Sequence, residues 1–378
     1  MYPRVFEKYI LNHFKTVKKN KAVIIYGARQ VGKTTLVKKL MQNWQKSAYY
    51  SCDYFDVKQS FAYENTHNLA NIVKDLDLLI LDEAQLIENI GLVIKVLVDN
   101  FPKLNIITTG SSSFELANKI KEPLTGRKLE IHLNTLSFTE IYSKLTVLEK
   151  KRQIENHLVF GFYPEVVDAA LSDKAKILRE LTSSYLFKDV FTFQNFKKPE
   201  LLIKLLQLLA FQIGNEVSFH ELAKKLNIDQ TVIQRYIHLL EQAFVIYRVG
   251  AFANNLRKEI SKSRKIYFWD LGVRNALIQN FNNLDLRDDI GALWENFLVS
   301  ERLKMLNNQQ IFNNYYFWRT YDKKEIDYIE KTNKGLFAYE FKYSGKPRKT
   351  AAELFLKTYP NTRINVINPD NFLDFIEK

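Results

Sequence analysis

Apolar positions along the chain follow two different periods. Four short, largely apolar runs in the first third predict strands: 22–26 (AVIIY), 78–81 (LLIL), 104–109 (LNIITT) and 129–133 (LEIHL). Residues 36–44 (LVKKLMQNW) instead space their apolar side chains as a helix does. Because continuous apolar runs are typical of parallel strands covered on both faces, the pattern predicts a parallel sheet between helices in this part of the chain.

The middle of the chain combines a helical period with turn and strand signals. Three helices and two strands are expected there: helices at 199–213, 221–227 and 230–243, and strands at 244–249 and 265–269. Ser218 and Glu221 match a capping box for the second helix, and Pro199 lies in the first turn of the first helix. Three helices and a hairpin predict a winged helix, whose last helix reads DNA in many proteins. The alternative is a winged helix that contacts a protein or serves as a lid or linker.

The C-terminal third predicts one long amphipathic helix followed by strands. The expected elements are a helix at 290–306, strands at 315–321, 325–331 and 336–343, a helix at 351–359 and a strand at 363–368. In 336–343 every second residue is Phe or Tyr, which predicts a core face. Glu340 and Lys342 share the opposite face, and they form either a cross-strand ion pair or part of an active site.

A glycine-rich sequence follows the first apolar run at once. GARQVGKTT (27–35) fits the phosphate-binding pattern G-x-x-x-x-G-K-[ST]. Its glycines let backbone N–H groups close around phosphates, Lys33 neutralises their charge, and the Thr34 hydroxyl binds Mg²⁺. A strand before the motif and a helix after it argue against a chance match. We therefore expect ATP or GTP to contact nine residues: Gly27, Ala28, Arg29, Gln30, Val31, Gly32, Lys33, Thr34 and Thr35.

A second acidic motif follows the run 78–81. Asp82 and Glu83 stand at the carboxyl end of this predicted strand, where open α/β sheets bind ligands. Asp82 would hold Mg²⁺ through water, and Glu83 would orient and deprotonate the attacking water. The alternative for Glu83 is a surface acid at a strand end.

Ser111 and Arg127 are two further candidates for the hydrolytic site. Ser111 follows the run 104–109, which we expect to insert between the P-loop strand and the strand of the acidic motif; it would contact the γ-phosphate or the lytic water. The alternative is a Ser/Thr turn in which Ser113 caps the next helix. Arg127 would stabilise transition-state charge, in cis or from a neighbouring subunit, or else form a plain salt bridge.

An ordered set of motifs resembles one group of ATPases. GARQVGKTT, LILDEAQ, TTGSSS, LTGRKLEIHLNTLSFTE, GFYPEVV, SSYLFKDVF and KIYFWDLGVRNAL are similar to segments that recur in this order in bacterial and archaeal AAA-type ATPases with a C-terminal domain of unassigned function. The resemblance covers nearly the whole chain and implies an ATPase core on a P-loop sheet of the ASCE/AAA type. No clear equivalent of the second-sensor arginine of oligomeric AAA+ machines is found, and the oligomeric state stays open.

The order of acids in the C-terminal third looks like the PD-(D/E)xK nuclease core. A helix with Glu295, a strand with Asp327 and a strand with Glu340 and Lys342 follow one another. In such a core the three carboxylates would hold Mg²⁺, and Lys342 would orient the water or stabilise developing charge as the catalytic lysine. Acid-x-Lys triplets are also frequent by chance in a Lys-rich chain. A degenerate domain that binds DNA, RNA or protein is therefore the alternative.

Charge and composition bear on partners and location. The formal net charge of +13 favours an anionic partner such as DNA, or reflects a Lys-rich proteome. The residues expected to face DNA are Gln230, Thr231, Gln234 and Arg235, flanked by Lys224, Lys225, Arg257, Lys258, Lys262 and Arg264. The single cysteine, Cys52, excludes an intrachain disulfide. No signal peptide and no run of 18 apolar residues occur, so we expect a soluble, cytoplasmic protein without membrane contact.

These observations predict an α/β protein with four parts. They are a P-loop ATPase core at 1–140, its helical extension at 141–197, a winged-helix-like module at 198–270 and a restriction-endonuclease-like α/β domain at 271–378. We expect the protein to bind and hydrolyse ATP with Mg²⁺, to associate with DNA, and to couple its nucleotide state to the two C-terminal modules. The alternative is an ATP-dependent switch whose C-terminal domain is an inactive module that binds protein or nucleic acid.

Overall fold

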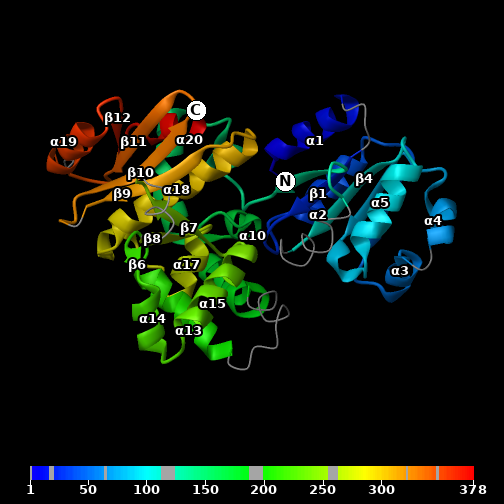
Figure 1. Ribbon diagram of the computed structural model, residues 1–378, viewed down its shortest axis with the longest axis horizontal. Coiled ribbons are helices and arrows are strands. Elements are labelled where there is room, and N and C mark those ends of the chain that lie inside the picture. Colours follow the sequence, from blue (N-terminus) through cyan, green and yellow to red (C-terminus); the bar gives the residue numbers. More distant parts are fainter. Residues whose placement is uncertain are drawn as a thin grey trace. The chain divides into compact units, whose positions relative to one another are not determined.

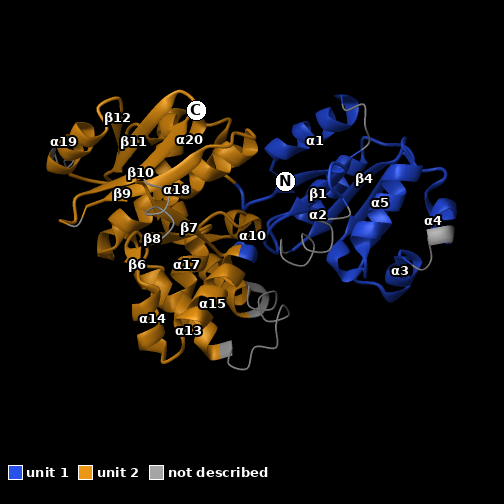
Figure 2. Cartoon of the chain, viewed as in Figure 1, with its two compact units in different colours: residues 1–136, 188–194, 242–244 blue, residues 137–187, 195–241, 245–378 orange. Residues whose placement is uncertain are grey.

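The chain forms two compact units (Figure 2). The computed structural model describes residues 2–16, 21–63, 66–111, 124–186, 199–253, 263–320, 322–345 and 349–378. Unit 1 consists mainly of the residues up to 136, and unit 2 mainly of those from 137 onward. Each unit is built on a sheet of its own.

Unit 1 contains a parallel five-stranded sheet in the order β2-β3-β4-β1-β5 (Figure 1). Its strands are β1 Ala22–Tyr26, β2 Ser47–Ser51, β3 Leu78–Asp82, β4 Asn105–Gly110 and β5 Lys128–His132. Its helices are α1 Val5–Thr16, α2 Lys33–Met41, α3 Phe55–Ser60, α4 Thr66–Val73, the 3-10 turn η2 Ala84–Leu86 and α5 Ile90–Asn100. The four predicted strands are confirmed, and β4 lies between β1 and β3 as expected.

Burial of both faces of this sheet explains its continuous apolar strands. Ile24 of β1 and Leu79 of β3 pack in one cluster with Leu97 of α5. Val23 and Ile80 alternate with them along the strands, so they face the other way, and they are buried as well. Every residue of β1 and β3 is buried, as is typical of central parallel strands.

Unit 2 begins with short helices and continues with the elements predicted for a winged helix. The short helices are α7 Phe138–Tyr142, α8 Val147–Arg152, α9 Ile154–Phe160, α10 Pro164–Asp168, α11 Leu171–Glu180 and the π-helix η3 Leu181–Leu186. The next elements are α13 Pro199–Phe211, β6 Glu216–Val217, α14 Phe219–Leu226, α15 Gln230–Gln242, β7 Ile246–Ala251 and β8 Arg264–Phe268. Strand β8 pairs antiparallel with both β7 and β6, so the predicted hairpin is present with one added strand.

Only half of the predicted capping box forms at the start of α14. Ser218 Oγ accepts a hydrogen bond from the Glu221 backbone N–H at 3.3 Å. The Glu221 carboxylate instead pairs with Lys225 Nζ at 2.8 Å, one helical turn further on. Ser218 therefore caps the helix alone.

The C-terminal part of unit 2 follows the predicted order of elements. They are α17 Leu271–Leu277, the 3-10 turn η4 Leu284–Leu286, α18 Ile290–Asn308, β9 Asn314–Arg319, β10 Glu325–Thr332, β11 Gly335–Phe341, α19 Lys349–Thr358, β12 Arg363–Ile367 and α20 Phe372–Glu377. Strand β10 is antiparallel to β9 and β11, and β12 is parallel to β11. Helices α18 and α20 contact each other through Phe297 and Phe372, while Phe355 of α19 packs with Ile329 and Ala338 in a separate cluster.

One mixed sheet of seven strands crosses the predicted boundary at residue 270. Its order is β12-β11-β10-β9-β7-β8-β6. The join is the parallel pairing of β7 with β9, in which Gly250 lies opposite Tyr316 and Ala251 opposite Phe317. The winged-helix-like part and the C-terminal part thus share a sheet, and β8 contacts α18.

Helix α18 is buried on nearly all sides, whereas the sequence predicted an amphipathic helix. Trp294 is buried as expected, but so are Asn296, Glu301 and Lys304. Their polar groups have partners: Asn296 exchanges two hydrogen bonds of 2.8 Å with the backbone of Phe268, and Lys304 Nζ pairs with Glu301 at 2.9 Å. A sequence pattern cannot distinguish buried polar residues that have partners from exposed ones, so the helix was predicted to be amphipathic.

Some predictions fall outside the part of the chain that the structure describes. They concern Ser113 as a helix cap and the flanking basic residues Arg257, Lys258 and Lys262. Among the described helices, none is both long enough and apolar enough to span a lipid bilayer.

Candidate nucleotide site and a buried charge cluster

The predicted phosphate-binding loop connects β1 to the first turn of α2. Lys33 is buried at the start of α2, and its Nζ donates hydrogen bonds to the backbone oxygens of Gly27 at 2.8 Å and Ala28 at 2.9 Å. Gly27 admits no side chain, because a Cβ there would lie 2.2 Å from the Leu133 carbonyl oxygen. Gly32 has a φ of 98°, which favours glycine. The other predicted contact residues belong to the same loop and helix start: Ala28, Arg29, Gln30, Val31, Thr34 and Thr35.

The Asp82 carboxylate accepts hydrogen bonds from three hydroxyl groups. Thr34 Oγ1 donates to Asp82 Oδ2 at 2.7 Å, and Tyr49 Oη donates to the same oxygen at 2.6 Å. Thr109 Oγ1 donates to Oδ1. Tyr49, Asp82 and Thr109 come from the neighbouring strands β2, β3 and β4, which parallel pairing places side by side. Burial raises the pKa of Tyr49, and the bond to Asp82 raises it further, so Tyr49 stays a proton donor.

Glu83 is linked to Ser111 through Gln85. The Glu83 backbone adopts a left-handed conformation with φ of 53°, and its N–H donates to Thr109 Oγ1 at 3.0 Å. Gln85 Nε2 lies 2.6 Å from Glu83 Oε2 and 3.3 Å from Ser111 Oγ. The structure therefore brings together the predicted base, Glu83, and the predicted sensor, Ser111.

The residues present fit a magnesium-bound nucleotide. A hydroxyl and a carboxylate, from Thr34 and Asp82, lie 2.7 Å apart, and both are oxygen ligands of the kind that Mg²⁺ prefers. The loop before α2 supplies backbone N–H groups at a helix N-terminus, and Lys33 supplies a positive charge beside them.

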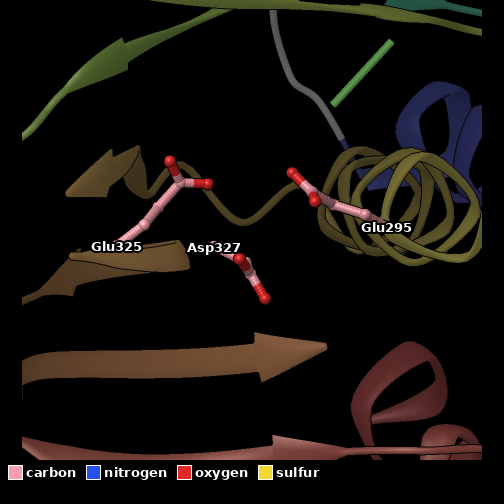
Figure 3. A group of neighbouring side chains, drawn as sticks. All are labelled: Glu295, Glu325 and Asp327. Atoms are coloured by element: carbon pink, nitrogen blue, oxygen red, sulfur yellow. The ribbon is translucent and has the colours of Figure 1, made fainter. Parts of the chain in front are cut away.

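A second cluster of acids lies in unit 2 (Figure 3). Glu295 reaches from α18 toward Glu325 and Asp327 of β10. One carboxylate oxygen from each residue lies within 4.8 Å of the others. The predicted pair Glu295 and Asp327 is thus brought together, and Glu325 joins it.

Lys265 of β8 inserts its ammonium group into this cluster. Its Nζ lies 2.8 Å from Glu295 Oε1 and 2.5 Å from Glu325 Oε1, and its side chain is 0% exposed. Tyr267 Oη donates to Glu295 Oε1 at 2.6 Å, and Lys342 Nζ lies 3.9 Å from Asp327 Oδ2.

Burial and charge act in opposite directions on these groups. Burial alone would lower the pKa of Lys265, but Glu295, Glu325 and Asp327 together raise it, so the lysine stays charged. Burial raises the pKa of Glu295 to about 7, while Lys265 opposes that rise. The pKa of Asp327 is also raised by burial.

Glu340 is not part of this group, contrary to expectation. The register between β9 and β10 shifts between Ile326 and Ile329, as in a β-bulge. Both isoleucines pack in the cluster beneath α19, together with Ala338 of β11. Asp327 lies between them and so leaves the regular alternation, whereas Glu340 stays on the face of Ala338 and is 3% exposed.

As they stand, these residues do not fit a bound divalent metal. The ammonium of Lys265 already contacts two of the three carboxylates, and a metal ion beside it would be repelled. The predicted third ligand, Glu340, is also absent from the group. We therefore assign no metal-dependent step to the cluster.

Family models match three successive parts of the chain. Residues 19–142 match a model described as an AAA domain. Residues 151–284 and 290–374 match two models that are each described as a domain of unknown function. The chain contains an AAA-type P-loop domain. Its five-stranded sheet, with β4 between β1 and β3, has the strand order predicted for this class.

Two relatives that match most of the chain are described only as uncharacterised proteins. An uncharacterised protein of Methanocaldococcus jannaschii is 26% identical over 407 residues, which cover 96% of this chain and 88% of that protein. One of Mycobacterium tuberculosis is 26% identical over 330 residues, covering 86% and 71%. A solved structure, a Walker-type ATPase of Pyrococcus abyssi, matches with a TM-score of 0.50 and 13% identity over 74% of this chain and 96% of that one. The likeness to this structure shows the fold.

Arg127 lies at the opposite end of the strands from the phosphate-binding loop, so the structure does not support a role in cis at the γ-phosphate. Its carbonyl oxygen accepts the backbone N–H of Ala22, the first residue of β1, whereas the phosphate-binding loop follows the last residue, Tyr26. Arg127 Nε instead pairs with Asp99 at 2.6 Å, and both side chains are exposed. The salt-bridge alternative is thus the one found within the chain.

Sequence reasoning missed several residues of these two sites, among them Tyr49, Gln85, Lys265 and Glu325. Two of them, Glu325 and Gln85, had a local signal, because each lies two residues from a predicted acid. Tyr49 and Lys265 come from distant strands and approach the acids only through the sheet order.

Proposed function

We propose that the protein binds and hydrolyses ATP with Mg²⁺ and that its nucleotide state changes the affinity of unit 2 for DNA. The observation that carries the first part is the contact of Thr34 with Asp82, at the point where β3 ends beside the phosphate-binding loop. This pairing of a hydroxyl and a carboxylate is the arrangement that holds Mg²⁺ in P-loop hydrolases.

Four polar side chains of unit 1 have a role in this proposal. Lys33 leaves the carbonyl groups of Gly27 and Ala28 and contacts the phosphates, because a phosphate carries full negative charge. Thr34 and Asp82 hold Mg²⁺, which supplies charge neutralisation at the phosphates. Glu83 accepts the proton of the attacking water after its carboxylate leaves Gln85.

Substitution of Glu83 tests the hydrolysis step. Glu83→Gln should lower turnover of ATP by roughly 10²- to 10⁴-fold while ATP binding is kept, because only the base is lost. Glu88→Gln, which alters an exposed acid in the same segment, serves as the control and should turn over ATP as the wild type does. Unchanged turnover in Glu83→Gln would exclude Glu83 as the base.

The support for DNA is a polar and basic surface on the winged-helix-like elements. Gln230, Thr231, Gln234 and Arg235 are all exposed on α15. Lys224 and Lys225 are exposed at the end of α14. Arg264 contributes less, because its guanidinium lies 4.5 Å from the ring centre of Phe219 and is half-buried. The chain as a whole carries a formal charge of +13.

Salt dependence of duplex DNA affinity tests this surface. If Arg235 contacts a phosphate, Arg235→Ala should weaken binding and reduce the slope of log K against log salt by about 1. Lys357→Ala removes an exposed cation from α19 and is the matched control. A salt response that is flat in the wild type would contradict phosphate contacts.

A nuclease function is the second candidate, and two observations favour it. Helix α18, antiparallel β9, β10 and β11, helix α19 and parallel β12 follow the element order expected of a PD-(D/E)xK core. Lys342 also lies beside Asp327. Lys265 argues against it, since it occupies the acid cluster. Mg²⁺- or Mn²⁺-dependent cleavage of single-stranded and duplex DNA, lost in Lys342→Ala, would support a nuclease; equal background in both proteins would refute it.

A further inference from the structure

We propose that Lys265 is the resident cation of the cluster formed by Glu295, Glu325 and Asp327, so that the C-terminal core is stabilised by a lysine where a divalent metal would otherwise bind. The inference is independent of ATP hydrolysis, and it decides between the two interpretations of the C-terminal part.

The first support is geometric. Three carboxylate oxygens lie within 4.8 Å of one another, which is the spacing of a cage for one cation. The Nζ of Lys265 lies at hydrogen-bond distance from Glu295 and Glu325, and the Asp327 charge also acts on it. An ammonium group with three donors matches this cage of three acceptors.

The second support is the balance of charge around the cage. Three cationic side chains face the three carboxylates: Lys265, Lys342 at 3.9 Å from Asp327, and Arg319 Nη1 at 3.0 Å from Glu325 Oε2. A divalent ion added to this set would leave positive charge without a partner in a buried site, which is unfavourable. Without Lys265, three carboxylates would face only two cations, Lys342 and Arg319. The site would then carry a net negative charge, which a metal ion could neutralise.

The third support is that the fold holds Lys265 in place from both sides. Strand β8 is an inner strand of the sheet, and Lys265 is paired with Val249 of β7 and Glu216 of β6. Its Nζ also lies 5.4 Å from the ring centre of Phe317. The ammonium therefore cannot leave the cage by a loop movement, and a metal can enter only if the side chain itself turns away.

One consequence concerns how the two parts of unit 2 depend on each other. Lys265 belongs to the winged-helix-like strands, whereas Glu295, Glu325 and Asp327 belong to the C-terminal core. The ion pairs therefore stabilise the contact between these two parts of the shared sheet. Because no metal is involved, a chelator should not weaken this contact.

Thermal melting of the full chain with Mn²⁺, in the absence of nucleotide, tests the proposal. Wild-type protein should melt at the same temperature in EDTA and in millimolar Mn²⁺. Lys265→Met should melt several degrees lower in EDTA, since a buried charge loses its partner, and Mn²⁺ should restore part of the loss. The double variant Lys265→Met, Asp327→Asn should lose that restoration.

If Lys265→Met does not fold, Mn²⁺ binding to the wild type tests the proposal instead. The binding is measured by electron paramagnetic resonance. Wild type and Asp327→Asn should bind the same amount of Mn²⁺, because the cluster holds none. A Mn²⁺ site in the wild type that Asp327→Asn abolishes would overturn the proposal, and so would a folded Lys265→Met that shows no response to Mn²⁺. Neither result depends on turnover of ATP in unit 1.

Discussion

Glu295 should make the stability of unit 2 depend on pH near neutrality. Its side chain is 13% exposed, and burial raises its pKa from 4.5 to about 7, against the attraction of Lys265. The folded protein therefore holds a proton that the unfolded chain releases at lower pH. By linkage, the free energy of unfolding should fall as pH rises from about 4.5 through about 7.

The size of the effect follows from the difference in the pKa of Glu295 between the folded and the unfolded chain. A pKa difference of one corresponds to about 1.4 kcal/mol, so the raised pKa of Glu295 corresponds to at most about 3 kcal/mol between mildly acidic and mildly basic solution. Glu295→Gln cannot titrate and should lack this part of the pH dependence. The groups that contact or face Glu295 remain in both proteins: Lys265, Tyr267, Glu325 and Asp327. Lys342, which lies beside Asp327, is also unchanged.

Urea unfolding of wild type and Glu295→Gln at several pH values between about 5 and about 8 measures the difference. The stability of the wild type should decline relative to the variant as pH rises. Glu353→Gln, which alters an exposed acid on α19, is the control and should follow the wild type. Equal pH slopes for wild type and Glu295→Gln would refute the reasoning that burial dominates at this carboxylate.

Three other substitutions have defined outcomes. Tyr49→Phe removes a donor to Asp82; it should lower stability by about 1–2 kcal/mol and raise the Mg²⁺ concentration for half-maximal ATP turnover, and an unchanged Mg²⁺ dependence would exclude a positioning role. Arg302→Met leaves the carboxylate of Glu330 buried without its two bonds of 2.7 and 3.0 Å, so urea unfolding should show a loss of about 3–5 kcal/mol. Arg127→Ala breaks an exposed pair with Asp99 and should leave both stability and ATP turnover close to those of the wild type; a large loss of turnover would instead indicate a role in a neighbouring subunit.

The fold and the candidate nucleotide site of unit 1 were predictable because their signals are local. GARQVGKTT lies directly between an apolar run and a helical pattern, so loop, strand and helix were visible together. Asp82 and Glu83 end the buried strand β3, and parallel pairing then brings Asp82 to Thr34. The contact between Asp82 and Thr34 can be predicted from the strand order of the sheet alone.

The acid cluster of unit 2 was predictable only in part, because its contacts depend on register and on a distant strand. Regular alternation placed Asp327 beside Glu340, but the bulge in β10 separated them. Lys265 precedes Asp327 by a long stretch of sequence, and only the pairing of β7 with β9 brings β8 next to the core. A lysine in the apolar segment KIYFW was the one trace of it in the sequence.

The central claim, that nucleotide state controls DNA affinity, is tested most directly by duplex DNA binding at fixed salt. The measurement compares the Glu83→Gln protein saturated with Mg-ATP, the same protein with ADP, and the protein without nucleotide. A coupling of about 1–3 kcal/mol would change the dissociation constant by roughly 5- to 150-fold between ATP and ADP states. We expect such a difference, and equal affinities in all three states would contradict the claim.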